Sequence, residues 1–211
     1  MAAAAYPGAV QFIPAHATIP VLQKSVQSCH GCDLYRYATQ AVLGEGPSSA
    51  TLVLVGEQPG NEEDLQGRPF VGPAGRLLDR ALEEAGIDRE LVYVTNAVKH
   101  FKFEERGKRR IHKKPSMGEV RACHAWFEAE LAVVQPRLVG CLGATAAQSI
   151  LGGQFRLTKD RGNAIEVPSV GKVVATVHPS AILRAPDSEQ RDAEYRHFVE
   201  DLKVMRGLIR R

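Results

Sequence analysis

The sequence predicts an α/β protein of three layers, in which helices cover both faces of a four-stranded parallel sheet. Four short apolar runs carry this prediction, at residues 51–57, 91–98, 137–143 and 172–179. Their apolar residues are continuous rather than alternating, which is typical of strands that are buried on both faces. Segments with helical spacing lie between the runs, and strands that alternate with helices indicate a parallel sheet.

Three helical segments have clear boundaries. The first begins at Pro73, a residue favoured in the first turn, and ends at Gly86. The second runs from about residue 118 to 135, with apolar residues at helical spacing. The last begins at about Pro186 and keeps this spacing almost to the end of the sequence. A shorter helical segment near the N-terminus ends at Cys29.

Length and composition predict one domain, because 211 residues with 44% hydrophobic content can form a single sizeable core. Residues 1–18 show no chemistry and are expected to be a loosely ordered extension, with residues 19–211 forming the domain. No apolar run approaches the roughly 18 residues of a membrane span, and the first residues lack the pattern of a secretory signal. We therefore expect a cytoplasmic protein.

Positive charge is concentrated in one segment. Residues 99–114 contain eight Lys or Arg and two Glu, a net charge of +6, whereas the whole chain carries +3 and the remainder therefore −3. A short basic segment on a slightly acidic body is typical of a loop that contacts nucleic-acid phosphates. A solvated surface loop is the simpler alternative, since charge runs are common on loops.

The four cysteines of a cytoplasmic chain indicate metal or redox chemistry rather than disulfides. Cys29 and Cys32 form a C-x-x-C pair, and Cys123 lies on a predicted helix. Cys141 lies within an apolar strand and is expected in the core, so His100, at the end of the second strand, is the better candidate for a fourth ligand. The spacing does not separate zinc from a [4Fe–4S] cluster, and an ordinary pair of thiols is the simplest alternative.

Three loops leave the carboxyl ends of predicted strands, at residues 56–72, 96–117 and 178–185. Ligands of open α/β sheets bind at this edge, so the polar residues of these loops are expected to meet in one crevice. Glu57 ends the first strand and is placed to act as a base or an electrostatic residue. Phe70 either packs into the core or offers a flat face on which a base can stack.

The segment HPSAILR, from His178 to Arg184, follows the last predicted strand. A histidine at a strand end can simply cap a loop. The apolar tip that ends in Arg184 has a second use, because such a wedge can enter a base stack and hold open the gap left by an extruded nucleotide.

Five features occur in one order: GEQPG, GRPFVGPAGRLLD, VYVTNAVKH, a cysteine on the following helix, and HPSAILR. Together they resemble the iron-sulfur uracil-DNA glycosylases of family 4 over roughly residues 25 to 205. Family 4 has a cysteine where this chain has His100, and it lacks the insertion GKRRIHKKPS. In both respects the chain is similar to the UdgX class of the same superfamily, which implies the uracil-DNA glycosylase fold and a role in base-excision DNA repair.

The resemblance also implies a [4Fe–4S] cluster with a structural role. By position its ligands are Cys29, Cys32, His100 and Cys123. The cluster would join the N-terminal segment to the helix that bears Cys123 and help to place the basic loop. It takes no part in bond breaking.

Motif positions imply a pocket for an extruded uracil. Phe70 stacks on the base, Asn96 pairs with its O4 and N3 edge, and His178 donates to O2. Gln58 begins the glycine-rich stretch that is expected to exclude the methyl group of thymine. The implied partner is uracil-containing DNA, with single strands favoured, and the protein is expected to be a monomer.

The implied reaction uses Glu57 to stabilise a cation-like sugar and His112 to attack C1′ and remain attached. Neighbouring cations are expected to disfavour the protonated form of His112. The implied DNA contacts are Lys108, Arg109, Arg110, Lys113 and Arg184. One alternative is a multiple-turnover glycosylase in which His112 only shields the site or contacts phosphate. A second is a non-catalytic binder of single-stranded nucleic acid. A third is an iron-sulfur electron carrier, which leaves the crevice residues unexplained.

Overall fold

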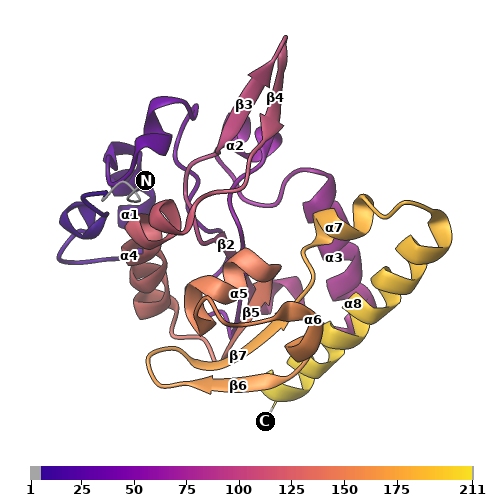
Figure 1. Ribbon diagram of the computed structural model, residues 1–211. Helices are drawn as coiled ribbons and strands as arrows, with labels where there is room; N and C mark the ends of the chain where they lie inside the picture. Colours follow the sequence, from indigo (N-terminus) through magenta and orange to yellow (C-terminus); the bar gives the residue numbers. More distant parts are fainter. Residues whose placement is uncertain (1–5, 211) are drawn as a thin grey trace.

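The computed structural model describes residues 6–210, and its centre is a five-stranded sheet with the strand order β2-β1-β5-β7-β6 (Figure 1). Strands β2, β1, β5 and β7 are parallel, and β6 pairs antiparallel with β7 at one edge. The five strands are β1 (Leu52–Gly56), β2 (Val92–Asn96), β5 (Leu138–Leu142), β6 (Ala164–Val167) and β7 (Gly171–Thr176).

The predicted α/β class and the four parallel strands are confirmed, but the sheet has a fifth strand. The sequence of β6, AIEV, is short and alternates between exposed and half-buried residues. This edge strand is not covered on both faces, so it lacks the continuous apolar run that identifies the other four.

Helices cover both faces of the sheet (Figure 1). One face packs against α1 (Ile19–Ser25), α4 (Met117–Val134) and α5 (Ala144–Leu151), and the other against α3 (Pro73–Ala85), α7 (Pro179–Leu183) and α8 (Ser188–Ile209). The shorter elements are α2 (Asn61–Gln66), α6 (Leu157–Asp160), η1 (Val10–Phe12), η2 (Val26–Ser28), η3 (Asp33–Arg36) and η4 (Arg89–Leu91). Within residues 6–210, no helix combines the length and the apolar character of a membrane span.

The strands supply both cores because their side chains alternate between faces. Val53 and Val55 belong to the core beneath α4 and α5, whereas Leu52 and Leu54 belong to the core beneath α3 and α8. All four are fully buried. This double burial explains why the strand runs are apolar throughout.

The ends of the three long helices follow the signals in the sequence. Helix α3 has Pro73 at its start and Gly86 after its last residue, where the positive φ of 68° suits glycine. Helix α4 begins with a capping box between Ser116 and Glu119, and the Asp187 side chain caps α8. The predicted boundaries are therefore correct to within about two residues.

Residues 6–18 pack against the domain. The backbone N–H of Gly8 donates to Gly31 (3.0 Å) and that of Ala9 to Ala122 on α4 (2.8 Å). Ala9 is buried, and Phe12 packs against the same core. This part of the expected loose extension is thus held in place through backbone that is irregular apart from the single turn η1, which leaves no periodic signal in the sequence. Residues 1–5 lie outside the described part.

The basic segment contains a β-hairpin where the sequence predicts a loop. Strands β3 (Phe103–Arg106) and β4 (Arg109–His112) pair antiparallel and project from the body of the domain (Figure 1). The turn between them uses Gly107 at a φ of 60°. Because the hairpin is mostly exposed and rich in arginine, apolar patterning does not reveal it.

Candidate active site

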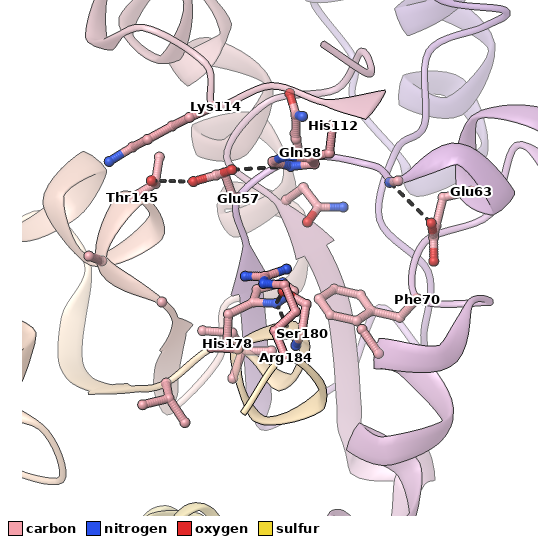
Figure 2. A pocket seen from close by; sticks show the side chains of 18 of the residues that line it. Glu57, Gln58, Glu63, Phe70, His112, Lys114, Thr145, His178, Ser180 and Arg184 are labelled. Atoms are coloured by element: carbon pink, nitrogen blue, oxygen red, sulfur yellow. Dashed lines mark hydrogen bonds and ion pairs between the residues drawn. The ribbon is translucent and has the colours of Figure 1, made fainter. Parts of the chain in front are cut away.

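A cavity of about 410 Å³ lies at the carboxyl ends of the parallel strands (Figure 2). Its volume falls within the range of small-molecule sites. It draws residues from all three loops that the sequence places at this edge. The residues predicted for the site that line it are Glu57, Gln58, Phe70, Asn96, His112, His178 and Arg184.

Glu57 and His112 meet at the upper side of this cavity. Nε2 of His112 lies 3.3 Å from Oε1 of Glu57. Glu57 directly follows β1, and His112 is the last residue of the hairpin strand β4. The His112 side chain is 51% exposed and that of Glu57 is 21% exposed, so the pair faces the cavity from a partly open edge.

The second oxygen of Glu57 accepts a hydrogen bond from the hydroxyl of Thr145 in the first turn of α5, and Figure 2 shows Glu57 between Thr145 and His112. Burial opposes ionisation of Glu57, but hydrogen bonds from His112 and Thr145 outweigh it, and the pKa of Glu57 lies below its usual range. A carboxylate near the start of a helix is also favourably placed in the helix dipole. Sequence reasoning missed Thr145. The signal that could have found it is the change from strand to helix at Gly143, which places the first turn of a helix at the carboxyl edge of the sheet.

His178 caps the short helix α7 and presents a neutral ring to the cavity. Its Nδ1 accepts a hydrogen bond from the backbone N–H of Ser180 (3.1 Å), which leaves the proton of the neutral ring on Nε2. Burial lowers the pKa of His178 to about 4, against the attraction of Glu57 and with help from Arg184. The ring is therefore a neutral hydrogen-bond donor at pH 7. Ser180, which fixes this tautomer, was not predicted.

Phe70 forms a flat wall of the cavity. Its ring stacks with that of His178 at a centroid distance of 6.1 Å. Phe70 has a positive φ of 57°, and its carbonyl lies so close to Gly75 that any Cβ there would overlap it. Gly56 is equally constrained, because a Cβ would overlap both the Phe70 ring and Oδ1 of Asn96.

The loop that carries Phe70 is tied together by Glu63. This carboxylate accepts hydrogen bonds from the backbone N–H groups of Gly60 (3.0 Å) and Gly72 (2.8 Å). The two ends of the segment from residue 60 to 72 are thus held by one buried side chain. The position of the aromatic wall follows from this staple.

Asn96 is 3% exposed and ends β2 at the cavity. Its side-chain amide has no hydrogen-bond partner in the described part of the chain, so both amide groups are free for a ligand. The backbone carbonyl of Asn96 accepts a hydrogen bond from Nζ of Lys99 (2.7 Å). Lys99 also donates to Thr95 (2.7 Å) and to Glu130 on α4 (2.5 Å), and the Lys99 and Glu130 side chains are each only 1% exposed.

The amide of Gln58 joins the two ends of the hairpin segment. Its Nε2 donates to the carbonyls of Lys102 (3.1 Å) and Lys113 (3.2 Å), and its Oε1 accepts from the backbone N–H of Lys102 (3.1 Å). Gln58 lines the cavity, but its polar groups are engaged with the protein. It therefore positions the hairpin and offers the cavity only its apolar stem.

Arg110 points into the protein rather than towards solvent. Its guanidinium donates to Asp64 (2.6 Å), Asn61 (2.8 Å) and Thr39 (3.2 Å), and its side chain is 19% exposed. The interpretation of Arg110 as a phosphate contact therefore does not fit the structure. Asp64 is 46 residues from Arg110 in the sequence, so the pairing leaves no local sequence signal.

The other predicted phosphate contacts are accessible. Lys108 and Arg109 lie exposed on the hairpin, and Arg184 lies exposed beside the cavity. Lys113 is exposed but lies 3.5 Å from Glu104. Lys114 also lines the cavity.

Three of the four cysteines lie near one another in the core. Cys29, Cys32 and Cys123 are buried in the same core and carry free thiols. Nε1 of Trp126 donates to Sγ of Cys29 (3.1 Å), and the backbone N–H of Lys99 donates to Sγ of Cys123 (3.3 Å). Burial raises the pKa of Cys32 to about 11 and that of Cys123 to about 12.

His100 is 5% exposed, and burial lowers its pKa to about 4, so the imidazole is neutral. It follows Lys99, whose backbone contacts Cys123. Cys141 is fully buried within β5, in the core as predicted. Across residues 6–210, no three His, Cys, Asp or Glu side chains are placed to hold one metal ion.

Fold and cavity together define an α/β protein with a small-molecule-sized site at the carboxyl edge of its sheet. The chain belongs to the uracil-DNA glycosylase superfamily, because the model of that family, "Uracil DNA glycosylase superfamily", matches residues 43–203. It is 38% identical over 192 residues to the type-4 uracil-DNA glycosylase of Thermotoga maritima, covering 90% of this chain and 94% of that protein. It is 36% identical over 185 residues to the type-4 enzyme of Archaeoglobus fulgidus, covering 84% and 89%.

Replacement of Lys99 by Met should destabilise the protein by about 3 kcal/mol, because Glu130 would be left as an unpaired buried charge. Urea unfolding followed by circular dichroism measures this loss. The double variant Lys99→Met with Glu130→Leu removes both charges and should recover much of the stability. Equal stability of the single variant and the unmodified protein would contradict the role given to this pair.

Proposed function

We propose that this protein excises uracil from DNA and that His112 then becomes covalently joined to C1′ of the abasic site. The observation that carries the proposal is the 3.3 Å contact between His112 and Glu57 at the edge of the cavity. A carboxylate and an imidazole so placed can act on one sugar carbon. The relatives named type-4 uracil-DNA glycosylases support the excision step.

Recognition of uracil uses the free groups of the cavity. The base stacks on Phe70, the amide of Asn96 pairs with O4 and N3, and the Nε2 proton of His178 faces O2. Cytosine presents an amino group where uracil presents O4, so an amide in a fixed orientation would leave unpaired buried groups. Sites of this kind discriminate strongly. Lys99 donates to the backbone carbonyl of Asn96 and so fixes the backbone from which this amide projects.

Bond breaking leaves negative charge on the departing base and positive charge on the sugar. Neutral His178 donates to the developing oxyanion, and a preorganised donor of this type contributes about 3 kcal/mol. Glu57 is held as the carboxylate by Thr145 and stabilises the sugar cation. The electrons of the glycosidic bond leave with uracil.

The covalent step joins His112 to the sugar. The lone pair of one imidazole nitrogen forms a bond to C1′, and the proton of the imidazole passes to Glu57, directly or through water. Glu57 returns this proton to the uracil anion, so the products are neutral uracil and an uncharged alkylated imidazole. The carbon-nitrogen bond then has no good leaving group, which makes the reaction single-turnover.

The DNA substrate is proposed to be single-stranded by preference and bound by a monomer. A base in a single strand can enter the cavity without breaking a base pair. Exposed Lys108 and Arg109 on the hairpin, with Arg184 at the wedge of α7, supply positive charge beside the cavity.

We also propose that a [4Fe–4S] cluster binds at the buried thiols, with Cys29, Cys32, Cys123 and His100 as its ligands. These donors fit the group in kind, because the three thiols are buried in one core and His100, a buried neutral imidazole, follows Lys99, whose backbone N–H donates to Cys123. A cluster distributes its ligands over several irons rather than one. When bound, it would supply structural cross-linking between the N-terminal segment and α4. Its formation requires the thiols to lose their protons, which burial alone opposes.

The covalent step predicts a protein-DNA product on a denaturing gel. Incubation with uracil-containing single-stranded DNA should give a slow-migrating band that resists heat and detergent. His112→Gln should give no such band while still releasing uracil, because water beside Glu57 can attack instead. Free uracil without a shifted band from the unmodified protein would support multiple turnover and contradict the adduct.

Replacement of Glu57 by Gln should lower the rate of uracil release by at least about 100-fold, because the carboxylate that stabilises the sugar cation is lost. Affinity for the same DNA should stay within about threefold. Single-turnover assays measure the rate of uracil release, and fluorescence anisotropy measures the affinity for DNA. A variant that binds and cleaves like the unmodified protein would exclude Glu57 from the chemistry.

The pH dependence of uracil release follows from two depressed pKa values. Glu57 must be ionised and His178 neutral, and both conditions hold above their pKa values, that of His178 being about 4. The rate should therefore be flat near neutrality and fall only as the pH drops towards about 4. The profile is measured on the unmodified protein under single-turnover conditions, because the hydrogen bond from His112 is one of the contacts that hold the pKa of Glu57 low. A fall centred near pH 6.5 in protein that remains folded would contradict the assignment.

A further inference from the structure

We propose that a second hollow, formed by Arg76, Arg80 and Arg191, binds the phosphates of the DNA strand that continues from the extruded nucleotide. This hollow has a volume of about 340 Å³ and lies between α3, α7 and α8. The inference rests on the proposed function, because it takes DNA as the ligand.

The hollow adjoins the active-site cavity. Helix α7 separates the two: Ala181 and Arg184 face the first cavity, and Leu183 faces the hollow. The first turn of α3 also contributes to both spaces, because Ala74 lines the first cavity and Arg76 lines the hollow. A strand with one nucleotide in the first cavity that passes over the α7 wedge therefore arrives at the arginines.

The charge of the hollow suits a phosphate. Its lining contains three arginines and one carboxylate, Asp192, a net charge of 3 − 1 = +2. Arg76 and Arg191 are exposed, and no carboxylate in the described part of the chain lies within ion-pair distance of either. Arg76 donates to the exposed carbonyl of Val71 (3.4 Å), and neither arginine has a carboxylate partner such as the Asp64 partner of Arg110, so both guanidinium groups can turn towards a ligand.

Arg80 is preorganised within the same lining. Its Nε donates to the hydroxyl of Tyr195 (2.9 Å), and its guanidinium lies over the Tyr195 ring at 4.2 Å. The same hydroxyl donates to Glu84 (2.9 Å), which also lies 3.7 Å from Arg80. These contacts fix Arg80 at the hollow while Leu183, which is 40% exposed, offers an apolar surface to the sugar.

The test measures affinity for oligonucleotides that extend to one side of the uracil only. Each contains 2′-fluoro-2′-deoxyuridine, which resists cleavage, followed by ten nucleotides on either its 5′ or its 3′ side. The double variant Arg76→Gln with Arg191→Gln should bind one of the two roughly tenfold more weakly at low salt. For that oligonucleotide, the slope of log K against log salt should fall by about 1.4, since each phosphate contact on a single strand contributes about 0.7.

The matched control is Arg196→Gln with Arg210→Gln, which removes the same charge from exposed positions outside the hollow. It should change neither affinity. The subsite would be overturned if the Arg76 and Arg191 variant lost no affinity, or lost it equally for both oligonucleotides. It would also be overturned if the control variant lost as much affinity. Release of uracil from a uracil-centred trinucleotide by the unmodified protein tests the proposed function separately.

Discussion

The contact between Glu57 and His112 requires an exposed hairpin to be held against the end of a buried strand. Glu57 is positioned directly by the buried central strand that it follows. His112 lies on a hairpin that has little core of its own, so its position relies on polar anchors. Gln58 ties both ends of the hairpin segment to the strand loop, and Arg110 binds the buried Asp64. Gln58 and Arg110, which the sequence assigned to base and DNA binding, thus position His112, the proposed nucleophile.

A second buried interaction connects Asn96, which ends β2 at the cavity, with Cys123. Lys99 donates from its side chain to the carbonyl of Asn96 and from its backbone N–H to Sγ of Cys123. Its partner Glu130 lies on α4, the helix that also bears Cys123. A group bound at the cysteines would therefore stiffen the backbone segment from which the Asn96 amide projects. The cost of burying this ion pair is offset because its polar atoms are fully hydrogen-bonded.

Sequence patterns predicted the features that arise from local periodicity or from strand ends. The parallel strands, the long helices and the edge at which Glu57, Asn96 and His178 meet all follow from such patterns. Features that depend on pairing between distant residues were missed or misassigned. Arg110 is indistinguishable from its exposed neighbours until Asp64 is placed beside it, and Thr145 is an ordinary residue of a helix start until Glu57 faces it.

The most direct test of the Glu57 and His112 contact is mass spectrometry of the digested product after reaction with uracil-containing DNA. The peptide that contains His112 should gain the mass of the abasic deoxyribose and its attached nucleotides, and fragmentation should locate the gain on the imidazole. An unmodified His112 peptide together with complete release of uracil, or an adduct on another residue, would contradict the view that this imidazole and the Glu57 carboxylate act on the same sugar carbon.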